Sequence, residues 1–162
     1  KSLPSVVKNS PDLKVVLVGG RNFTSWEKEL INSYNFENII VHLKTVSDTE
    51  LIGLYKHAMA FVFPSLYEGF GLPVLEAFAC ETPVICSNTS SIRGVADDAA
   101  QYFETQNIKS ISEAIICVIN SEDRRKTLKE KGKQRVADFN WSKAVEQTLD
   151  CYSKALKTKI DE

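Results

Sequence analysis

Two glutamates, Glu68 and Glu76, stand eight positions apart on either side of a glycine-rich turn in the segment FPSLYEGFGLPVLEAFA, residues 63–79. Gly69 and Gly71 are expected to tighten that turn, and such backbone presents N–H groups that an anion can approach closely. A carboxylate beside the turn can accept paired hydrogen bonds from vicinal hydroxyls, as sugars and ribose offer. Charge-assisted bonds of this kind are about twice as strong as neutral ones. The pair therefore indicates a site for a diphosphate flanked by two hydroxylated groups.

Two simpler interpretations of the segment stay open. In the first, it is only a strand-to-helix turn, in which Pro73 begins the helix and Glu76 gains about 0.3–1 kcal/mol from the helix dipole. In the second, Gly69-x-Gly71 begins a dinucleotide-binding fingerprint. The third glycine position of that fingerprint is Val74, and no acidic residue ends the next strand. A Walker-type phosphate loop is excluded, because no Gly-Lys-Ser/Thr follows.

The composition is that of an ordinary globular chain of one domain, with 162 residues, 43% of them apolar and 25% charged. A formal net charge of −1 provides no overall attraction to nucleic acid or to a membrane. The four cysteines form no CxxC pair, and neither histidine lies at metal-ligand spacing from them. This pattern predicts a cytoplasmic chain with reduced thiols and no bound metal.

Apolar runs suited to buried strands alternate with helical patterns along the chain. The expected strands are 13–20, 38–43, 60–65, 82–87 and 99–103, and the expected helices are 24–34, 48–58, 72–80, 107–119, 121–138 and 141–157. Strands that are continuously apolar are buried on both faces, as in a parallel sheet covered by helices. The alternation therefore predicts an α/β fold with a Rossmann-like, doubly wound parallel sheet.

In such a sheet, ligands bind at the carboxyl ends of the strands, where loops lead into helices. Arg21, Lys44 and Val46 follow the first two expected strands and are candidates for phosphate or base contacts. Each of the two cations is more often simply solvated. The basic segment 121–135 also has two interpretations, a solvated helix or a contact with an anionic membrane surface.

The segment FPSLYEGFGLPVLEAFACETPVICS, residues 63–87, resembles the glutamate–seven residues–glutamate signature of retaining glycosyltransferases of the large group 1 (family 4) class. The resemblance extends upstream through VSDTELIGLYKHAMAFVFPS and downstream through GVADDAAQYF to FNWSKAVEQTLDCY. It implies that residues 1–162 form the donor-binding, C-terminal half of a two-domain GT-B enzyme. Such enzymes transfer a sugar from a nucleotide sugar to a glycan, lipid-linked or other hydroxyl acceptor with retention. They need no metal, and the sequence contains no Asp-x-Asp triplet.

The same resemblance implies roles for individual residues. Glu68 would approach the transferred sugar as the catalytic carboxylate, and Glu76 would hold the ribose of the nucleotide. The backbone that would meet the sugar and the diphosphate belongs to Gly69, Phe70, Gly71 and Leu72.

The chain departs from the family pattern outside this motif. Glycines usual in the family are replaced by Glu81, Lys44 and Asp97, and its Pro-Glu pair corresponds to Arg93-Gly94. The family's first strand, which would be central in the sheet, and its acceptor-binding domain are not found in this sequence. We therefore expect the chain alone to transfer no sugar, and the acceptor to be reached in the cytoplasm or at the cytoplasmic membrane face.

Two alternatives to a transferase remain on the same fold. One is a non-catalytic module that binds a nucleotide sugar or a glycan, because a fold does not guarantee activity. The other is a different GT-B enzyme, such as a phosphorylase or an epimerase.

Overall fold

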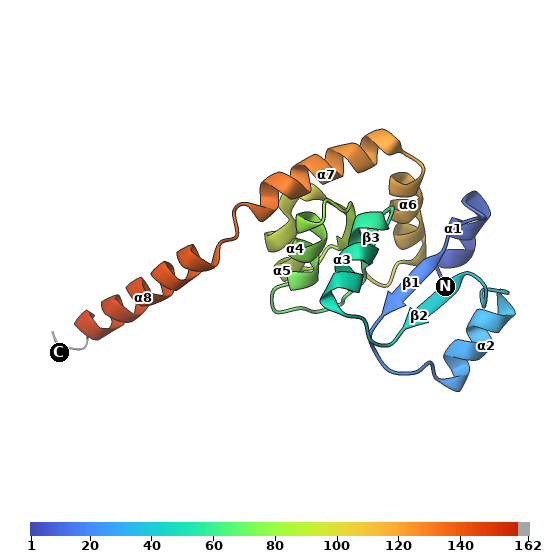
Figure 1. Cartoon of the computed structure of the whole chain (residues 1–162), viewed down its shortest axis with the longest axis horizontal. Coiled ribbons are helices and arrows are strands. Elements are labelled where there is room, and N and C mark those ends of the chain that lie inside the picture. The colour runs from blue at the N-terminus through green and yellow to red at the C-terminus, as the bar shows by residue number, and fades with distance from the viewer. Residues whose placement is uncertain (159–162) are drawn as a thin grey trace.

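The computed structural model describes residues 1–158, and strands and helices alternate along this chain (Figure 1). The strands are β1 (Val15–Val18), β2 (Ile40–Leu43), β3 (Phe61–Phe63), β4 (Val84–Ser87) and β5 (Ala100–Phe103). The helices are α1 (Leu3–Asn9), α2 (Ser25–Ser33), α3 (Asp48–His57), α4 (Leu72–Ala79), α5 (Ser90–Ala96), α6 (Ile108–Ile119), α7 (Glu122–Val136) and α8 (Trp141–Thr158), with a short 3-10 helix, η1 (Asp97–Ala99). Every strand and helix expected from the sequence is present, and α1 and α5 are additional.

All strand pairs are parallel, and they form two sheets. One sheet pairs β1 with β2, and the other has the order β3-β4-β5. The expectation of an α/β fold with parallel strands and flanking helices is confirmed. Among the described residues, β1 and β3 are each bonded to a strand on one side only. A central strand between these two open edges stays a prediction.

The three-stranded sheet carries the core, and helices cover both of its faces. In β4, Val84 and Cys86 pack with Phe78 of α4 and Ile92 of α5, whereas Ile85 points to the opposite face. There it meets the side chains of α1, α6 and α7, among which Val6 is fully buried. This alternation is the period of two of a strand. All four residues of β4 are buried, as its apolar run predicts.

Strand β1 is not buried, although its apolar run predicts burial on both faces. Val16, Leu17 and Val18 are 43%, 38% and 42% exposed, so the expectation that this strand is buried on both faces is wrong for the described structure. The physical reason is that, within the described residues, β1 packs mainly against β2 and no helix covers its faces closely. The apolar sequence of β1 therefore leaves apolar side chains on the surface of the described structure.

Helices α2 and α3 begin with matching capping boxes. The Ser47 side chain accepts a hydrogen bond from the Glu50 amide at 3.3 Å, and Glu50 Oε2 accepts one from the Ser47 amide at 2.7 Å. Thr24 and Glu27 do the same for α2. These reciprocal bonds satisfy two amides that a helix start otherwise leaves unpaired. The sequence Ser47-Asp48, with Glu50 early in the turn, predicts an N-cap at Ser47, and the structure confirms it.

Helix α7, the expected basic helix, packs against α4, α6 and η1, and its buried residues are Leu128 and Gly132. Several of its cations bond to neighbouring elements. Lys131 pairs with Asp98 at 2.6 Å and Lys133 with Glu81 at 3.0 Å. The interpretation of this segment as a simply solvated helix is therefore incomplete, because these cations also form ion pairs with neighbouring elements.

Helix α8 extends away from the body (Figure 1). The sequence of residues 139–152 predicts an amphipathic helix whose apolar side chains are packed. That prediction of packing is wrong for four side chains, because Trp141, Val145, Leu149 and Tyr152 are 82%, 54%, 58% and 64% exposed. The expectation holds for Phe139, which packs against the core just before the helix. Within residues 1–158, no helix is both long and apolar enough to cross a membrane.

Candidate functional site

The loop between β3 and α4 carries both glutamates, and the end of β4 holds this loop in place. Ser87, the last residue of β4, is fully buried and donates a hydrogen bond from Oγ to the Ser65 carbonyl at 2.6 Å. Ser65 Oγ in turn donates to the Tyr67 carbonyl at 3.1 Å. The loop is therefore tied to the carboxyl end of the neighbouring strand, where parallel sheets bind their ligands.

Gly71 ends the loop and is the N-cap residue of α4. Its φ of 102° lies in the left-handed region, which favours glycine. No side chain caps α4, and Pro73 stands at the first helical positions, as expected. Pro73 has no N–H, and the Val74 N–H donates to the Gly71 carbonyl at 3.0 Å. No side chain bonds to the other N–H groups of the first turn, and they carry the positive end of the helix dipole. This is an arrangement that accepts an anion.

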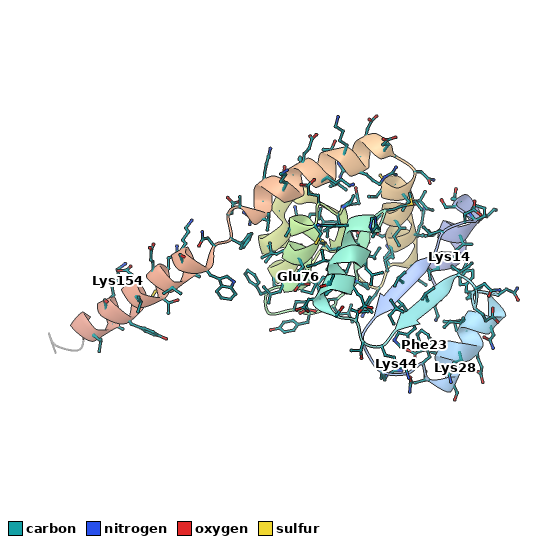
Figure 2. All side chains as sticks on the ribbon, viewed as in Figure 1. Lys14, Phe23, Lys28, Lys44, Glu76 and Lys154 are labelled. Carbon is teal, nitrogen blue, oxygen red and sulfur yellow. The ribbon has the colours of Figure 1, made fainter. Side chains whose placement is uncertain are left out.

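Glu76 lies one turn into α4, three residues beyond Pro73 and so about 4.5 Å further along the axis. It is exposed, and its Oε2 accepts a hydrogen bond from the Tyr55 hydroxyl at 3.3 Å. Figure 2 shows Glu76 on the body of the molecule, on the side where α3 and α4 lie. The carboxylate is thus turned away from the core and stays close to the start of α4.

Glu68 lies in the loop, three residues before Gly71, and is half-buried. It forms no hydrogen bond or ion pair with any residue that the structure describes. The two acids therefore flank the uncapped start of α4 along the chain, one before it and one a turn inside it. Their contacts with a sugar and a ribose stay predictions.

The remaining predicted donor-binding residues occupy the same loop and helix start. Gly69 is exposed, has no positive φ, and has open space where a Cβ would stand. The expectation that both glycines tighten the turn is therefore wrong for Gly69, since only Gly71 adopts a left-handed backbone. Phe70 is 45% exposed and contacts Phe139 edge-on, and Leu72 is 53% exposed.

The three candidates for phosphate or base contacts, Arg21, Lys44 and Val46, lie outside the loop and helix start that carry the two glutamates. Arg21 forms two hydrogen bonds with Glu27, at 2.7 and 3.1 Å, and these bonds together with those of Thr24 lower the pKa of Glu27 to about 2. Its guanidinium thus stabilises the start of α2. Lys44 is exposed, and Figure 2 shows it with Phe23, apart from Glu76. Val46 is half-buried just before α3. The contacts of these three residues with a phosphate or a base stay predictions.

Tyr55 and Ser87 contact the site, and the sequence patterns do not single them out. Tyr55 is 8% exposed, and its hydroxyl is the one hydrogen-bond partner of the Glu76 side chain among the described residues. Burial, followed by the charge of Glu76, raises the pKa of Tyr55 above its ordinary value. A buried tyrosine hydroxyl usually has a partner, and this is the signal that could have led to the pair.

The sequence contexts of the two histidines, a strand for His42 and a helix end for His57, favour structural roles. His42 Nε2 lies 2.8 Å from the Gly19 carbonyl, and its ring packs on Phe23. His57 is exposed at the end of α3. Over residues 1–158, no group of three or more His, Cys, Asp or Glu side chains is placed to hold a metal ion.

Two of the departures from the family pattern coincide with unusual backbone. Glu81 and Asp97 have φ values of 55° and 47°, in the region that favours glycine. The structure thus gives a reason for the glycines usual at these positions, and Glu81 and Asp97 keep the same backbone in their place.

Comparison with known proteins agrees with this arrangement. Residues 1–135 match the model of the family described as Glycosyl transferases group 1. The chain belongs to this family. The resemblance of the glutamate motif to group 1 glycosyltransferases is thereby confirmed, and so is the fold class, because similar solved structures are glycosyltransferases.

Three similar proteins illustrate the match. O-antigen chain mannosyltransferase B of Escherichia coli is 34% identical over 134 residues, which are 80% of this chain and 35% of that protein. Sucrose-phosphate synthase of Thermosynechococcus elongatus superposes with a TM-score of 0.79 at 26% identity, over 97% of this chain and 42% of its own. A variant of S. aureus TarM, in complex with fondaparinux, alpha-GlcNAc-glycerol and UDP, gives a TM-score of 0.80 at 19% identity, over 92% of this chain and 31% of its own.

This group 1 glycosyltransferase chain spans about a third of the length of the E. coli relative. The candidate site lies entirely within the part that matches the family, since α4 and its preceding loop fall inside residues 1–135.

Proposed function

We propose that this chain is the nucleotide-sugar binding part of a retaining, metal-independent glycosyltransferase. The observation that carries the proposal is an exposed carboxylate, Glu76, one turn inside a helix whose first-turn amides have no side-chain cap. A second acid, Glu68, precedes the same helix start. Membership of the group 1 family supports this function over that of an ordinary strand-to-helix turn.

In the proposed complex, the diphosphate lies at the N-terminus of α4, where amides and the helix dipole favour negative charge. Glu76 accepts hydrogen bonds from the ribose hydroxyls, and Glu68 approaches the transferred sugar. During transfer, the bond between the anomeric carbon and the diphosphate oxygen breaks. The acceptor oxygen then bonds to the same carbon on the same face of the sugar, and the proton of the acceptor hydroxyl passes to the departing diphosphate. The amides of α4 stabilise the charge that develops on the leaving diphosphate.

The substrates are proposed from the relatives. The E. coli relative is named an O-antigen chain mannosyltransferase, which favours a mannosyl donor and a glycan acceptor. The complex of the TarM variant contains UDP, which supports a nucleoside diphosphate as the leaving group. We place the reaction in the cytoplasm, where nucleotide sugars are made, and at the cytoplasmic membrane face when the acceptor is lipid-linked. Metal independence is supported by the absence of an Asp-x-Asp triplet from the sequence.

The roles of the two glutamates can be separated by experiment. In the full-length protein, calorimetric titration with UDP, GDP and ADP gives the nucleotide affinity, and a transfer assay gives the activity. Glu76→Ala is expected to weaken nucleotide binding about tenfold or more, because a hydrogen bond to a charged group is lost. Glu68→Ala should leave nucleotide affinity nearly unchanged and abolish transfer.

Glu113→Ala, at an exposed carboxylate that pairs with Lys109 on α6, is the matched control and should change neither quantity. Transfer should continue in excess EDTA. If both Glu68→Ala and Glu76→Ala keep full activity, the assigned roles are wrong. Nucleotide binding by the wild type without any transfer would instead support the non-catalytic binding module.

A further inference from the structure

Tyr55 of α3 contacts Glu76, the carboxylate that we assign to the ribose, although it stands 21 residues earlier in the chain. Its hydroxyl donates to Glu76 Oε2 at 3.3 Å. This bond joins α3 to α4 across the face of the sheet where the core cluster of Tyr55, Val74 and Phe78 lies. The contact therefore links the proposed nucleotide site to the core beneath it.

The tyrosine is held rigidly, whereas the glutamate is not. Tyr55 is 8% exposed, and its ring contacts Phe61 edge-on with centroids 5.1 Å apart. Its carbonyl accepts a hydrogen bond of 2.7 Å from Thr82 Oγ1, and Thr82 is itself 2% exposed. Glu76, by contrast, is exposed, and its side chain has no other hydrogen bond or ion pair within the described part of the chain. The Tyr55 hydroxyl is thus held in place by packing, and it is the one group that bonds to the Glu76 side chain among the described residues.

The direction of the bond follows from the chemistry of the two groups. An ionised carboxylate only accepts hydrogen bonds, so the tyrosine hydroxyl must donate. Burial favours the neutral phenol, and the nearby Glu76 charge favours it further. The bond occupies one acceptor position on Oε2 and leaves Oε1 free. A carboxylate fixed in this way can still bind two vicinal hydroxyls.

We propose that Tyr55 is a positioning residue, which holds the Glu76 carboxylate in the orientation that grips the nucleotide ribose. The inference rests on the proposed function, since it takes Glu76 as the ribose contact. A free glutamate would lose rotamer freedom on binding, and a carboxylate that is already oriented loses less. The hydroxyl of Tyr55 should therefore matter for nucleotide affinity, although it touches no substrate.

The test is Tyr55→Phe in the full-length protein, which removes only the hydroxyl and keeps the packed ring. Titration with UDP, GDP and ADP should show affinity for the best of these nucleotides weakened about threefold to tenfold, the range expected for losing one indirect polar contact. The KM for the donor should rise by a similar factor, while kcat at saturating donor stays unchanged. A purely structural role for the hydroxyl would not produce this split.

Tyr102→Phe is the matched control. Tyr102 is also partly buried, and its hydroxyl also donates, but to the Asp97 carbonyl and away from Glu76. It should leave nucleotide affinity and KM unchanged. In a Glu76→Ala background, Tyr55→Phe should cause no further loss, because the group through which it acts is gone.

The outcomes separate the positioning role from the proposed function. If the wild type binds none of the three nucleoside diphosphates, the proposed function fails, and the role of Tyr55 fails with it. If the wild type binds but Tyr55→Phe binds equally well, the positioning role alone is overturned. It is also overturned if Tyr102→Phe weakens binding as much, or if the loss from Tyr55→Phe persists undiminished without Glu76.

Discussion

Glu81 adopts a backbone conformation that most residues avoid. Its φ of 55° lies in the left-handed region at the turn after α4. An L side chain is disfavoured there by roughly 1–2 kcal/mol. The side chain reaches Lys133 at 3.0 Å, but both partners are largely exposed, so this ion pair contributes little. The backbone strain should therefore outweigh the ion pair.

We predict that Glu81→Gly raises the free energy of unfolding by up to about 1 kcal/mol, because relief of strain exceeds the greater entropy of glycine in the unfolded chain. Chemical denaturation of the two proteins gives the difference. Lys133→Ala, which removes the ion pair and keeps the backbone, is the control and should have little effect. Both variants lack the ion pair, so a Glu81→Gly variant that is less stable than Lys133→Ala would show that relief of backbone strain does not exceed the entropy cost of glycine.

At the residue scale, the sequence predicted the positions of Glu68 and Glu76 better than the residues that contact them. Residue types and spacing placed Glu68 and Glu76 on either side of a helix start, and the structure has them there. Gly69 and Gly71 look alike in the sequence, and only the φ value separates the one that needs to be glycine. Tyr55 could not be predicted as a partner of Glu76, because their contact depends on how α3 packs against α4.

At the scale of elements, α7 packs closely against α4 because Gly132 of α7 has no side chain where it meets Phe78 of α4. Gly132 lies inside α7, and a Cβ built on it would stand 2.5 Å from Cδ1 of Phe78. Phe78 is 1% exposed and belongs to the core, so it has little room to move. Glycine in a helix interior is normally unfavourable, which means that close packing is the reason for it here.

Gly132→Ala should therefore lower the free energy of unfolding by about 1–3 kcal/mol, as overpacking of a core does. The matched control is Gly53→Ala in α3, where a new Cβ would meet nothing within 4 Å. That change should raise the free energy of unfolding by about 0.5–1 kcal/mol through helix propensity alone. Thermal or chemical unfolding measures both. If the two substitutions shift stability in the same direction, the contact with Phe78 does not govern the packing of α7.

The elements themselves were predicted with different success. Strand β4 and helix α6 have clear apolar periods, and the structure has them close to the expected limits. Helices α1 and α5 were missed, because each has seven residues and so offers less than two full turns of pattern. The apolar stripe of α8 was interpreted correctly as amphipathic, but burial needs a partner surface, and the sequence does not say where that surface is.

At the scale of the whole molecule, the two sheets have different surroundings. The sheet β3-β4-β5 has a complete core on both faces, and it holds the loop and helix of the proposed donor site. The sheet β1-β2 keeps apolar side chains exposed, and β1 and β3 each have an open edge within the described residues. The expectation that the 162-residue chain alone transfers no sugar fits this picture and stays a prediction.

The most direct test of the proposed donor site is a crystal structure of the full-length protein with the nucleoside diphosphate that it binds best. We predict the diphosphate at the first-turn amides of α4 and both ribose hydroxyls within hydrogen-bonding distance of the Glu76 carboxylate, about 2.5–3.2 Å. A nucleotide bound away from the start of α4, or a ribose held by other groups while Glu76 faces water, would contradict this prediction.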